Sequence, residues 1–127
     1  MTWVRIDDSF YQHPKVMEAG PLGLAMQVAA LCYANRNLTD GFISRAVGPT
    51  LLNLDDAIWP TWNSVADGLV EAGLWEKMPR GFQIHDYEKY QPTRAQVEAE
   101  RIASAERQQR WRDAHSNGVS NASVTED

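Results

Sequence analysis

The chain has 127 residues, about the length of one domain, and 43% of them are apolar, which is enough for a packed core. Its formal net charge of −5 excludes a uniformly basic nucleic-acid-binding protein, so contacts to phosphate would have to come from local basic clusters. One cysteine excludes an intrachain disulfide and fits a reducing cytoplasm, and the sequence suggests neither a membrane span nor a signal peptide.

Two helices are predicted in the first third of the chain. The first covers residues 13–20, which have a proline in the first turn and end in glycine. The second covers residues 21–36, where Gln27 is the only strongly polar side chain of the central part. A helix that is apolar on nearly every side is usually buried, so we expect this one to be the core helix. Cys32 would then be a small buried apolar residue rather than a reactive thiol.

A turn, a short strand and a further helix follow. Asp40–Gly41 is a turn signal, and residues 42–44 favour a strand. Ser44 can cap a helix that begins at Arg45. A glycine–proline pair at residues 48–49 should kink or break that helix.

An amphipathic helix is predicted from about residue 60 to residue 72, after a loop at residues 53–60. Its apolar face is made by Trp62, Val65, Ala66, Leu69 and Val70. The side chains outside that face should meet solvent or a ligand, and they are Asn63, Ser64, Asp67 and Glu71.

A helix that leads directly into a hairpin is predicted over residues 69–87. Gly73 ends the helix, and two runs of alternating apolar and polar residues, 74–78 and 82–87, are split by Pro79–Gly81. With the preceding helices, this order is typical of a helix-turn-helix in which the hairpin forms a wing. The predicted fold is therefore mainly α with a small β-hairpin (α+β), a winged helix-turn-helix.

The chain changes character after Pro92. The following residues are mostly alanine, glutamate, arginine and glutamine, which are good helix formers, and the apolar stripe is thin. We therefore predict a winged-helix domain over residues 1–90 and an appended arginine-rich helix over residues 91–115. Residues 116–127 are small and polar, so we expect a disordered tail.

Several stretches together resemble a known family. They are WVRIDDSFYQHPKV, TDGFIS, VADGLVEAGLWE and GFQIHDYEKYQ. This set resembles the N-terminal winged-helix domain of phage replisome-organiser proteins, the DnaD-like replication initiators and the short helix-turn-helix proteins of actinobacterial phages. The resemblance implies DNA binding in phage replication or transcriptional control, in the cytoplasm of a bacterial host cell. A second folded domain after residue 115 is not predicted, so helicase loading is not expected.

No catalytic or metal-binding set is predicted, and no cofactor is expected. The histidines, His13, His85 and His115, are far apart in sequence and lack a cysteine or carboxylate at metal-ligand spacing. The aspartate pairs at residues 7–8 and 55–56 are expected to serve as turn or helix-start residues, because adjacent side chains diverge. A glycine-rich phosphate loop is also missing. We therefore expect a protein that is not an enzyme.

The candidate surface for double-stranded DNA has three parts, and the first is the start of the amphipathic helix. Its polar residues lie where a recognition helix presents side chains to base edges. An equal alternative is that they only cap and solubilise the helix, because Asp67 and Glu71 would repel phosphate. The candidate residues here are Thr61, Asn63 and Ser64, together with Arg45 of the preceding helix.

The wing and the arginine-rich helix are the other two parts. Lys77 and Arg80 flank the hairpin turn, although exposed hairpins also carry charges that block edge pairing. Residues 94–112 hold five arginines against three glutamates, a net charge of +2, which a solvated charged face explains equally well. In the stretch RQQRWR, an aromatic residue among arginines suits nucleic acid or a protein hot spot: Trp111 with Arg107, Arg110 and Arg112.

The alternative function is a winged-helix interaction module that binds a host or phage protein and not DNA. A homodimer or a protein partner would then be held through the C-terminal helix and Trp111. The charge around residues 61–71 discriminates between the two functions, because a positive field supports DNA and a negative field supports a protein.

Overall fold

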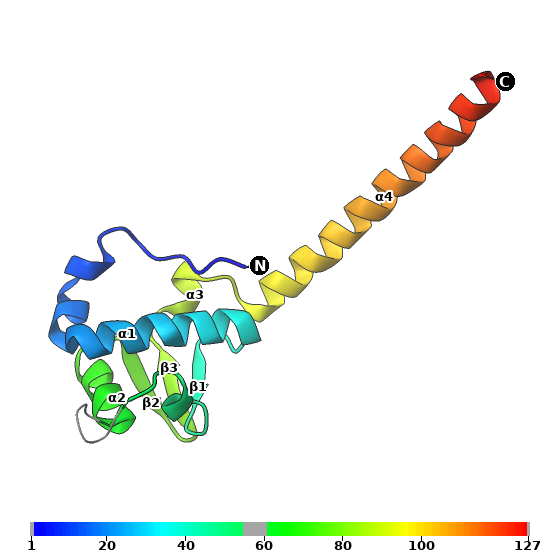
Figure 1. Ribbon diagram of the computed structural model, residues 1–127. Helices are drawn as coiled ribbons and strands as arrows, with labels where there is room; N and C mark the ends of the chain where they lie inside the picture. The colour runs from blue at the N-terminus through cyan, green and yellow to red at the C-terminus, as the bar shows by residue number, and fades with distance from the viewer. Residues whose placement is uncertain (1, 55–60, 127) are drawn as a thin grey trace. The chain divides into compact units, whose positions relative to one another are not determined.

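The computed structural model describes residues 2–54 and 61–126, with side chains up to residue 116 (Figure 1). Contacts divide the chain into two compact units, residues 1–93 and residues 94–127. The described chain is mainly helical and has one small three-stranded antiparallel sheet, which confirms the predicted α+β class.

Helix α1, Pro14–Asn37, consists of two helical segments that meet at Gly20. Gly20 has φ 78° and ψ 179°, a backbone conformation far from the helical region that glycine adopts readily. The predicted division of this stretch into two helices at Gly20 is therefore confirmed. At the other end, Leu38 takes a left-handed conformation and ends the helix.

The segment of α1 after Gly20 is buried on one face only. Met26, Ala30 and Ala34 are fully buried on the core face, whereas Ala25 and Cys32 are exposed. The prediction that Cys32 is buried is therefore wrong, because in this small unit the packed elements cover only one side of the helix. By length and composition alone α1 could also cross a membrane, a property that core helices of soluble proteins share.

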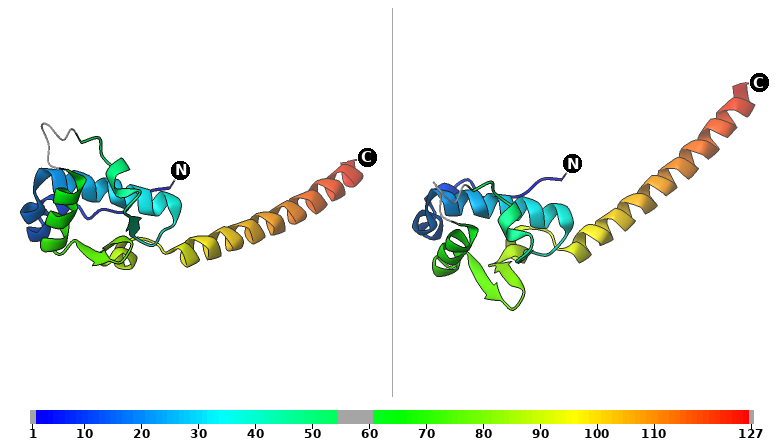
Figure 2. Two further views of the ribbon diagram at one scale, coloured as in Figure 1. Left: turned by 90° about the horizontal axis from the view of Figure 1, so that it is seen from below. Right: turned by 60° about the horizontal axis from the view of Figure 1, so that its bottom comes forward.

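The sheet has the strand order β1-β3-β2, and both pairs are antiparallel. Strand β1 is Phe42–Ser44, β2 is Trp75–Met78 and β3 is Gly81–Ile84. The strand at residues 42–44 and the hairpin that turns at Pro79–Arg80 are both as predicted. The hairpin turn projects from the body of this unit (Figure 2).

The helix predicted from Arg45 does not form. Residues 45–47 make a turn, and a single 3-10 turn, η2 at Gly48–Thr50, follows. The indole ring of Trp62 lies directly against Gly48, where an added Cβ would come within 2.3 Å of a ring carbon. Gly48 allows this close packing, and Pro49, which follows it, disfavours a longer helix.

Helix α2, Trp62–Glu71, packs against α1 and leads into β2. The predicted start near residue 60 and most of the predicted loop fall on residues 55–60, outside the described residues. The predicted stop at Gly73 is confirmed, since Gly73 has φ 83°. The amide N–H of Leu74 donates to Leu69 O at 2.9 Å, and that of Gly73 donates to Val70 O at 3.0 Å, the two bonds of a Schellman cap.

The core lies between α1, α2 and the sheet, with Trp75 at its centre. The indole Nε1 of Trp75 donates to Gln27 Oε1 at 2.6 Å. The Trp75 and Phe82 rings are 5.5 Å apart, and the Phe82 and Trp62 rings meet edge to face at 5.7 Å. Three aromatic rings therefore connect β2, β3 and α2, with one buried hydrogen bond to α1.

An extended N-terminal strap, residues 2–9, runs along the first unit and was not predicted. The backbone N–H of Arg5 donates to Gln91 Oε1 at 3.0 Å, and Gln91 Nε2 donates to Arg5 O. Asn35 Nδ2 donates to Thr2 Oγ1 at 3.3 Å. Gln91 is buried, so the first unit reaches beyond residue 90, where the sequence places the boundary.

Two short helical turns complete the first unit, and neither was predicted. The strap enters η1, Phe10–Gln12, just before α1. Helix α3, Tyr87–Tyr90, follows β3 and leads to Gln91. Both turns border the space above the C-terminal end of β3.

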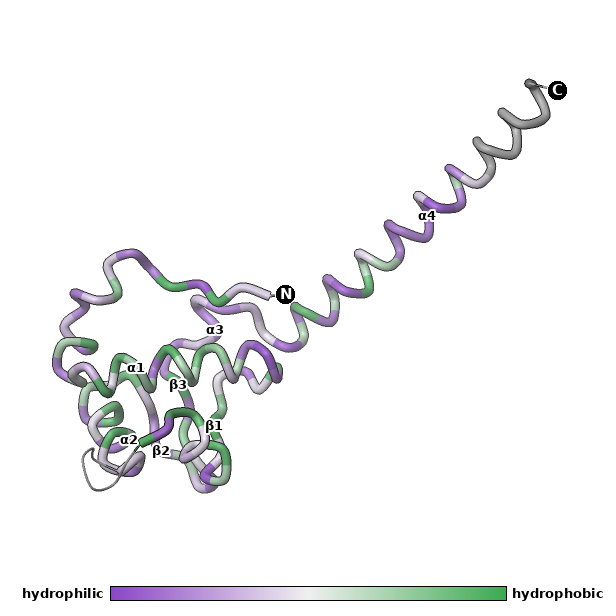
Figure 3. Tube along the Cα trace, in the orientation of Figure 1, coloured by the Kyte–Doolittle hydropathy of each residue, from purple (hydrophilic) through white to green (hydrophobic). Residues whose placement is uncertain are grey.

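Helix α4, Arg94–Glu126, makes up the second unit. The part of α4 that is coloured in Figure 3 is mostly hydrophilic, in contrast to the apolar middle of α1. Its large apolar side chains, Ile102 and Trp111, are about 60% exposed. The helix continues past Ser116, where the sequence predicts disorder, and the mobility of that tail stays a prediction.

Candidate nucleic-acid interface

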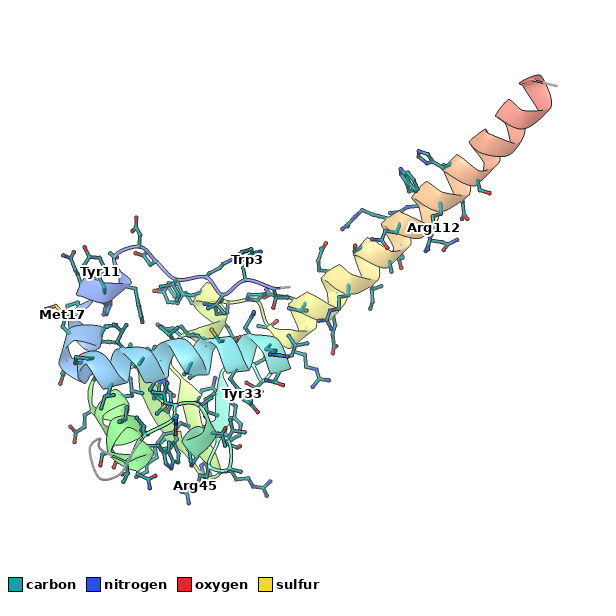
Figure 4. All side chains as sticks on the ribbon, viewed as in Figure 1. Trp3, Tyr11, Met17, Tyr33, Arg45 and Arg112 are labelled. Carbon is teal, nitrogen blue, oxygen red and sulfur yellow. The ribbon has the colours of Figure 1, made fainter. Side chains whose placement is uncertain are left out.

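Pairing of β1 with β3 gathers three basic residues, Arg45, Lys77 and Arg80, at the end of the sheet where β2 turns into β3. Ser44 pairs with Gly81, and the amide N–H of the next residue, Arg45, donates to Arg80 O at 3.1 Å. Lys77 lies one rung further in, opposite Phe82. We call these residues the sheet-tip cluster, and Figure 4 shows Arg45 at that end of the unit.

The close approach of β1 and β3 depends on Gly81. A Cβ at this position would lie 2.1 Å from Ile43 O, so any other residue would push the two strands apart. Glycine at the tip therefore holds the strand that carries Arg45 against the strand that follows Arg80.

The sheet-tip cluster is solvent-exposed and electrostatically uncompensated within the described part of the chain. All three side chains are exposed, and none forms an ion pair with another described residue. The sequence places Lys77 and Arg80 on either side of the hairpin turn, and they lie there in the structure, whereas their part in a wing stays a prediction. The sequence also places Arg45 on a helix, but that helix does not form. Arg45 reaches this end of the sheet because residues 42–44 pair with β3, and no local sequence pattern shows that pairing.

The predicted polar residues of α2 are exposed, but their surroundings are acidic. Thr61, Asn63 and Ser64 are all exposed, and Thr61 Oγ1 lies 3.4 Å from Ser64 Oγ. Asp67 and Glu71 are exposed on the same helix, which contains no lysine or arginine. The charge of α2 is therefore negative, which by the criterion above favours a protein partner over groove reading at this helix.

The arginines of α4 are exposed, and three of them have local partners, one of which is Glu98, 2.9 Å from Arg94 Nε. Arg107 Nη2 lies 2.8 Å from Glu100 Oε1, and Arg112 Nη2 donates to Gln109 Oε1 at 3.1 Å. Trp111 stacks on His115 with ring centroids 3.7 Å apart. Exposed pairs of this kind contribute little free energy, so these arginines can exchange their partners for a phosphate.

Within the described residues, no group of three or more histidine, cysteine, aspartate or glutamate side chains could hold a metal ion. His85 Nδ1 lies 2.6 Å from Glu76 Oε1, and its Nε2 lies 3.3 Å from Asp86 Oδ2, and all three side chains are exposed. The hydroxyl and the amide of Ser9 donate to Asp7 and lower the pKa of that carboxyl, as in a turn. The aspartate pair at residues 55–56 lies outside the described residues.

No protein-family model matches the sequence, and comparisons with curated proteins and with solved structures give no significant match either. The resemblance to replisome organisers therefore stays a prediction, and the function rests on the geometry of the interface alone.

Proposed function

We propose that the chain is a winged-helix DNA-binding protein that acts in phage replication initiation or transcriptional control. The order helix, strand, helical turn, helix and hairpin supports a winged helix, with η2 in the place of its second helix and β2–β3 as the wing. The strand order β1-β3-β2 puts the first strand beside the wing, so that both can face one ligand.

The observation that carries the proposal is the sheet-tip cluster. Three exposed cations without an ion pair among the described residues are gathered at one end of the sheet, two on the hairpin and Arg45 just after β1, although the chain as a whole is acidic. Phosphate contacts supply most of the affinity of DNA-binding proteins, and each requires a basic group free to reach the backbone. The cluster meets this requirement, and α2 does not.

The other candidate contacts have secondary parts in this proposal. The arginines around Trp111 add a basic segment on α4, and Trp111 can stack on an exposed base. On α2, Asn63 has the side chain best suited to reading adenine, if the wing brings that helix to a groove.

The test is binding to mixed-sequence duplex DNA over a range of salt concentrations. Alanine at Arg45, Lys77 or Arg80 should weaken binding to all sequences and reduce the slope of log affinity against log salt by about one phosphate each. Lys89→Ala is the matched control, because Lys89 is exposed on α3 at the opposite end of β3. Removing residues 107–127 should weaken binding further, and Asn63→Ala should blur sequence preference.

The DNA proposal fails if the intact protein does not bind duplex DNA at low salt, where electrostatic attraction is strongest. It also fails if Lys89→Ala reduces the salt slope as much as Arg80→Ala does, because the contact would then be non-specific attraction to any cation.

The acidic face of α2 supports a second candidate, a protein-interaction module. Asp67 and Glu71 would then contact basic residues of a host or phage protein. Asp67→Asn and Glu71→Gln distinguish the two functions, because loss of negative charge should strengthen DNA binding and weaken a protein contact.

A further inference from the structure

A cavity of about 200 Å³ lies between the N-terminal strap, α1 and the junction of β3 with α3. Its apolar walls come from Val16, Leu31, Leu74 and Ile84. Ile6 and Tyr90, which also line it, are about half exposed. The buried part of the lining is therefore largely aliphatic. The exposed part also carries charged and titratable side chains: Arg5, Asp7, His13, His85 and Asp86.

Gln27 also lines the cavity, and only 5% of its surface is exposed. Its Oε1 accepts the hydrogen bond from Trp75 Nε1, and indole nitrogen can only donate, so the orientation of the amide is determined. The Nε2 group then has no hydrogen-bond partner among the described residues. This group is accessible from the cavity, so it can donate to water or to the acceptor of a bound molecule.

We propose that this cavity binds a single-ring aromatic molecule that carries a hydrogen-bond acceptor for Gln27 Nε2. The volume determines the size of the ligand, because an aliphatic cavity of roughly 150 Å³ holds benzene. Drug-sized molecules occupy pockets of roughly 300–1,000 Å³ and would not fit. The buried aliphatic walls select an apolar ring, and the free N–H group of Gln27 selects an oxygen on it.

This site is separate from the sheet-tip cluster. Ile84 is the last residue of β3, whereas Arg80 precedes its first residue, so the two sites lie at opposite ends of the strand. The test of ligand binding in the cavity is therefore independent of the DNA-binding experiments.

The test compares phenol with toluene, which has a methyl group in place of the hydroxyl. Binding is followed by methyl NMR of the full-length protein at the residues of the cavity wall. Phenol should produce saturable shifts there and bind about 2- to 10-fold more tightly than toluene, the range expected of one hydrogen bond. Gln27→Met should abolish the preference for phenol while toluene still binds.

Gln27→Met also removes the acceptor of Trp75, so a second variant does not depend on it. Leu74→Phe places a ring in the cavity and should abolish saturable binding of both molecules. Ala25→Phe adds the same ring on the exposed face of α1 and should bind phenol like the parent protein. Phenol shifts that do not saturate, or that persist in Leu74→Phe, would overturn the proposal, because they would not come from binding in this cavity.

Discussion

Trp75 and Trp111 are two tryptophans in regions of opposite character, the first in a packed core and the second on an exposed helix. Trp75 is 1% exposed, donates a hydrogen bond to Gln27 and packs on Phe82, whereas Trp111 is 60% exposed and stacks on its helical neighbour His115. The first unit is held by burial of such side chains. The second unit is a helix of good helix formers with exposed local pairs. Packing energy therefore resides in residues 2–93, and α4 depends on intrinsic propensity.

The largest expected effect is at Trp75. Trp75→Ala should lower the free energy of unfolding by about 3–5 kcal/mol, because it removes a buried aromatic ring and leaves a cavity. Trp111→Ala should change it by less than about 0.5 kcal/mol, as exposed substitutions usually do. Urea denaturation followed by circular dichroism measures both, and similar losses in the two variants would contradict the division into a packed and an unpacked unit.

Leu31→Ala should cost about 2–5 kcal/mol, the usual range for a buried leucine. Leu31 is 7% exposed on the core face of α1. Ile102→Ala is the counterpart on α4 and should have almost no effect on unfolding of the first unit. A loss below about 1 kcal/mol for Leu31→Ala would place that face of α1 outside the core.

Tyr87 makes the stability of the first unit sensitive to alkali. Burial, with a smaller contribution from the charge of Asp40, raises the pKa of Tyr87 from 10.0 to about 12. The neutral phenol is therefore favoured in the folded state, and this stabilisation is complete below pH 10 and lost between pH 10 and about 12. The loss should reach about 2–3 kcal/mol.

The control for this prediction is Tyr87→Phe, which cannot ionise and should lack this part of the alkaline loss. Absorbance of tyrosinate measures the titration directly. No tyrosine occurs after residue 93, so the helicity of α4 should not follow it. Titration of Tyr87 near pH 10 in the folded protein would contradict the prediction.

The smallest effect concerns the boundary between the two regions. A chain that ends at Thr93 should unfold like residues 1–93 of the full-length protein. A chain that ends at Tyr90 lacks Gln91 and leaves the backbone N–H and C=O of Arg5 without partners, which should cost about 1–3 kcal/mol. Equal melting of the two shortened chains would show that the strap does not need Gln91.

Local signals predicted the elements that local chemistry determines. Gly20 and Gly73 ended helices where positive φ is required, and the strand at residues 42–44 and the hairpin were found from alternation and turn residues. The class followed from their order. The helix at Arg45 was wrong because its outcome depends on the Trp62 ring against Gly48, a contact between residues fourteen positions apart.

The candidate site was predicted in part for the same reason. Lys77 and Arg80 flank a turn that the sequence shows, so their position was correct. Arg45 joins them only through pairing of β1 with β3, which no local pattern encodes. The cavity at Gln27 was not anticipated at all, because the strap and α3 that enclose it have no periodicity to recognise.

The pairing of β1 with β3 also links recognition to folding. Arg45 and Arg80 are separated by about 35 residues in the chain, and they meet only while the sheet exists. In an unfolded chain the same cations are far apart, so a polyanion that contacts all of them binds the folded state more tightly than the unfolded state. At a concentration of about 100 times its dissociation constant, such a ligand would stabilise the first unit by about 2.7 kcal/mol through mass action. A shift of melting temperature with duplex concentration would then report occupancy of the tip without any label on the DNA.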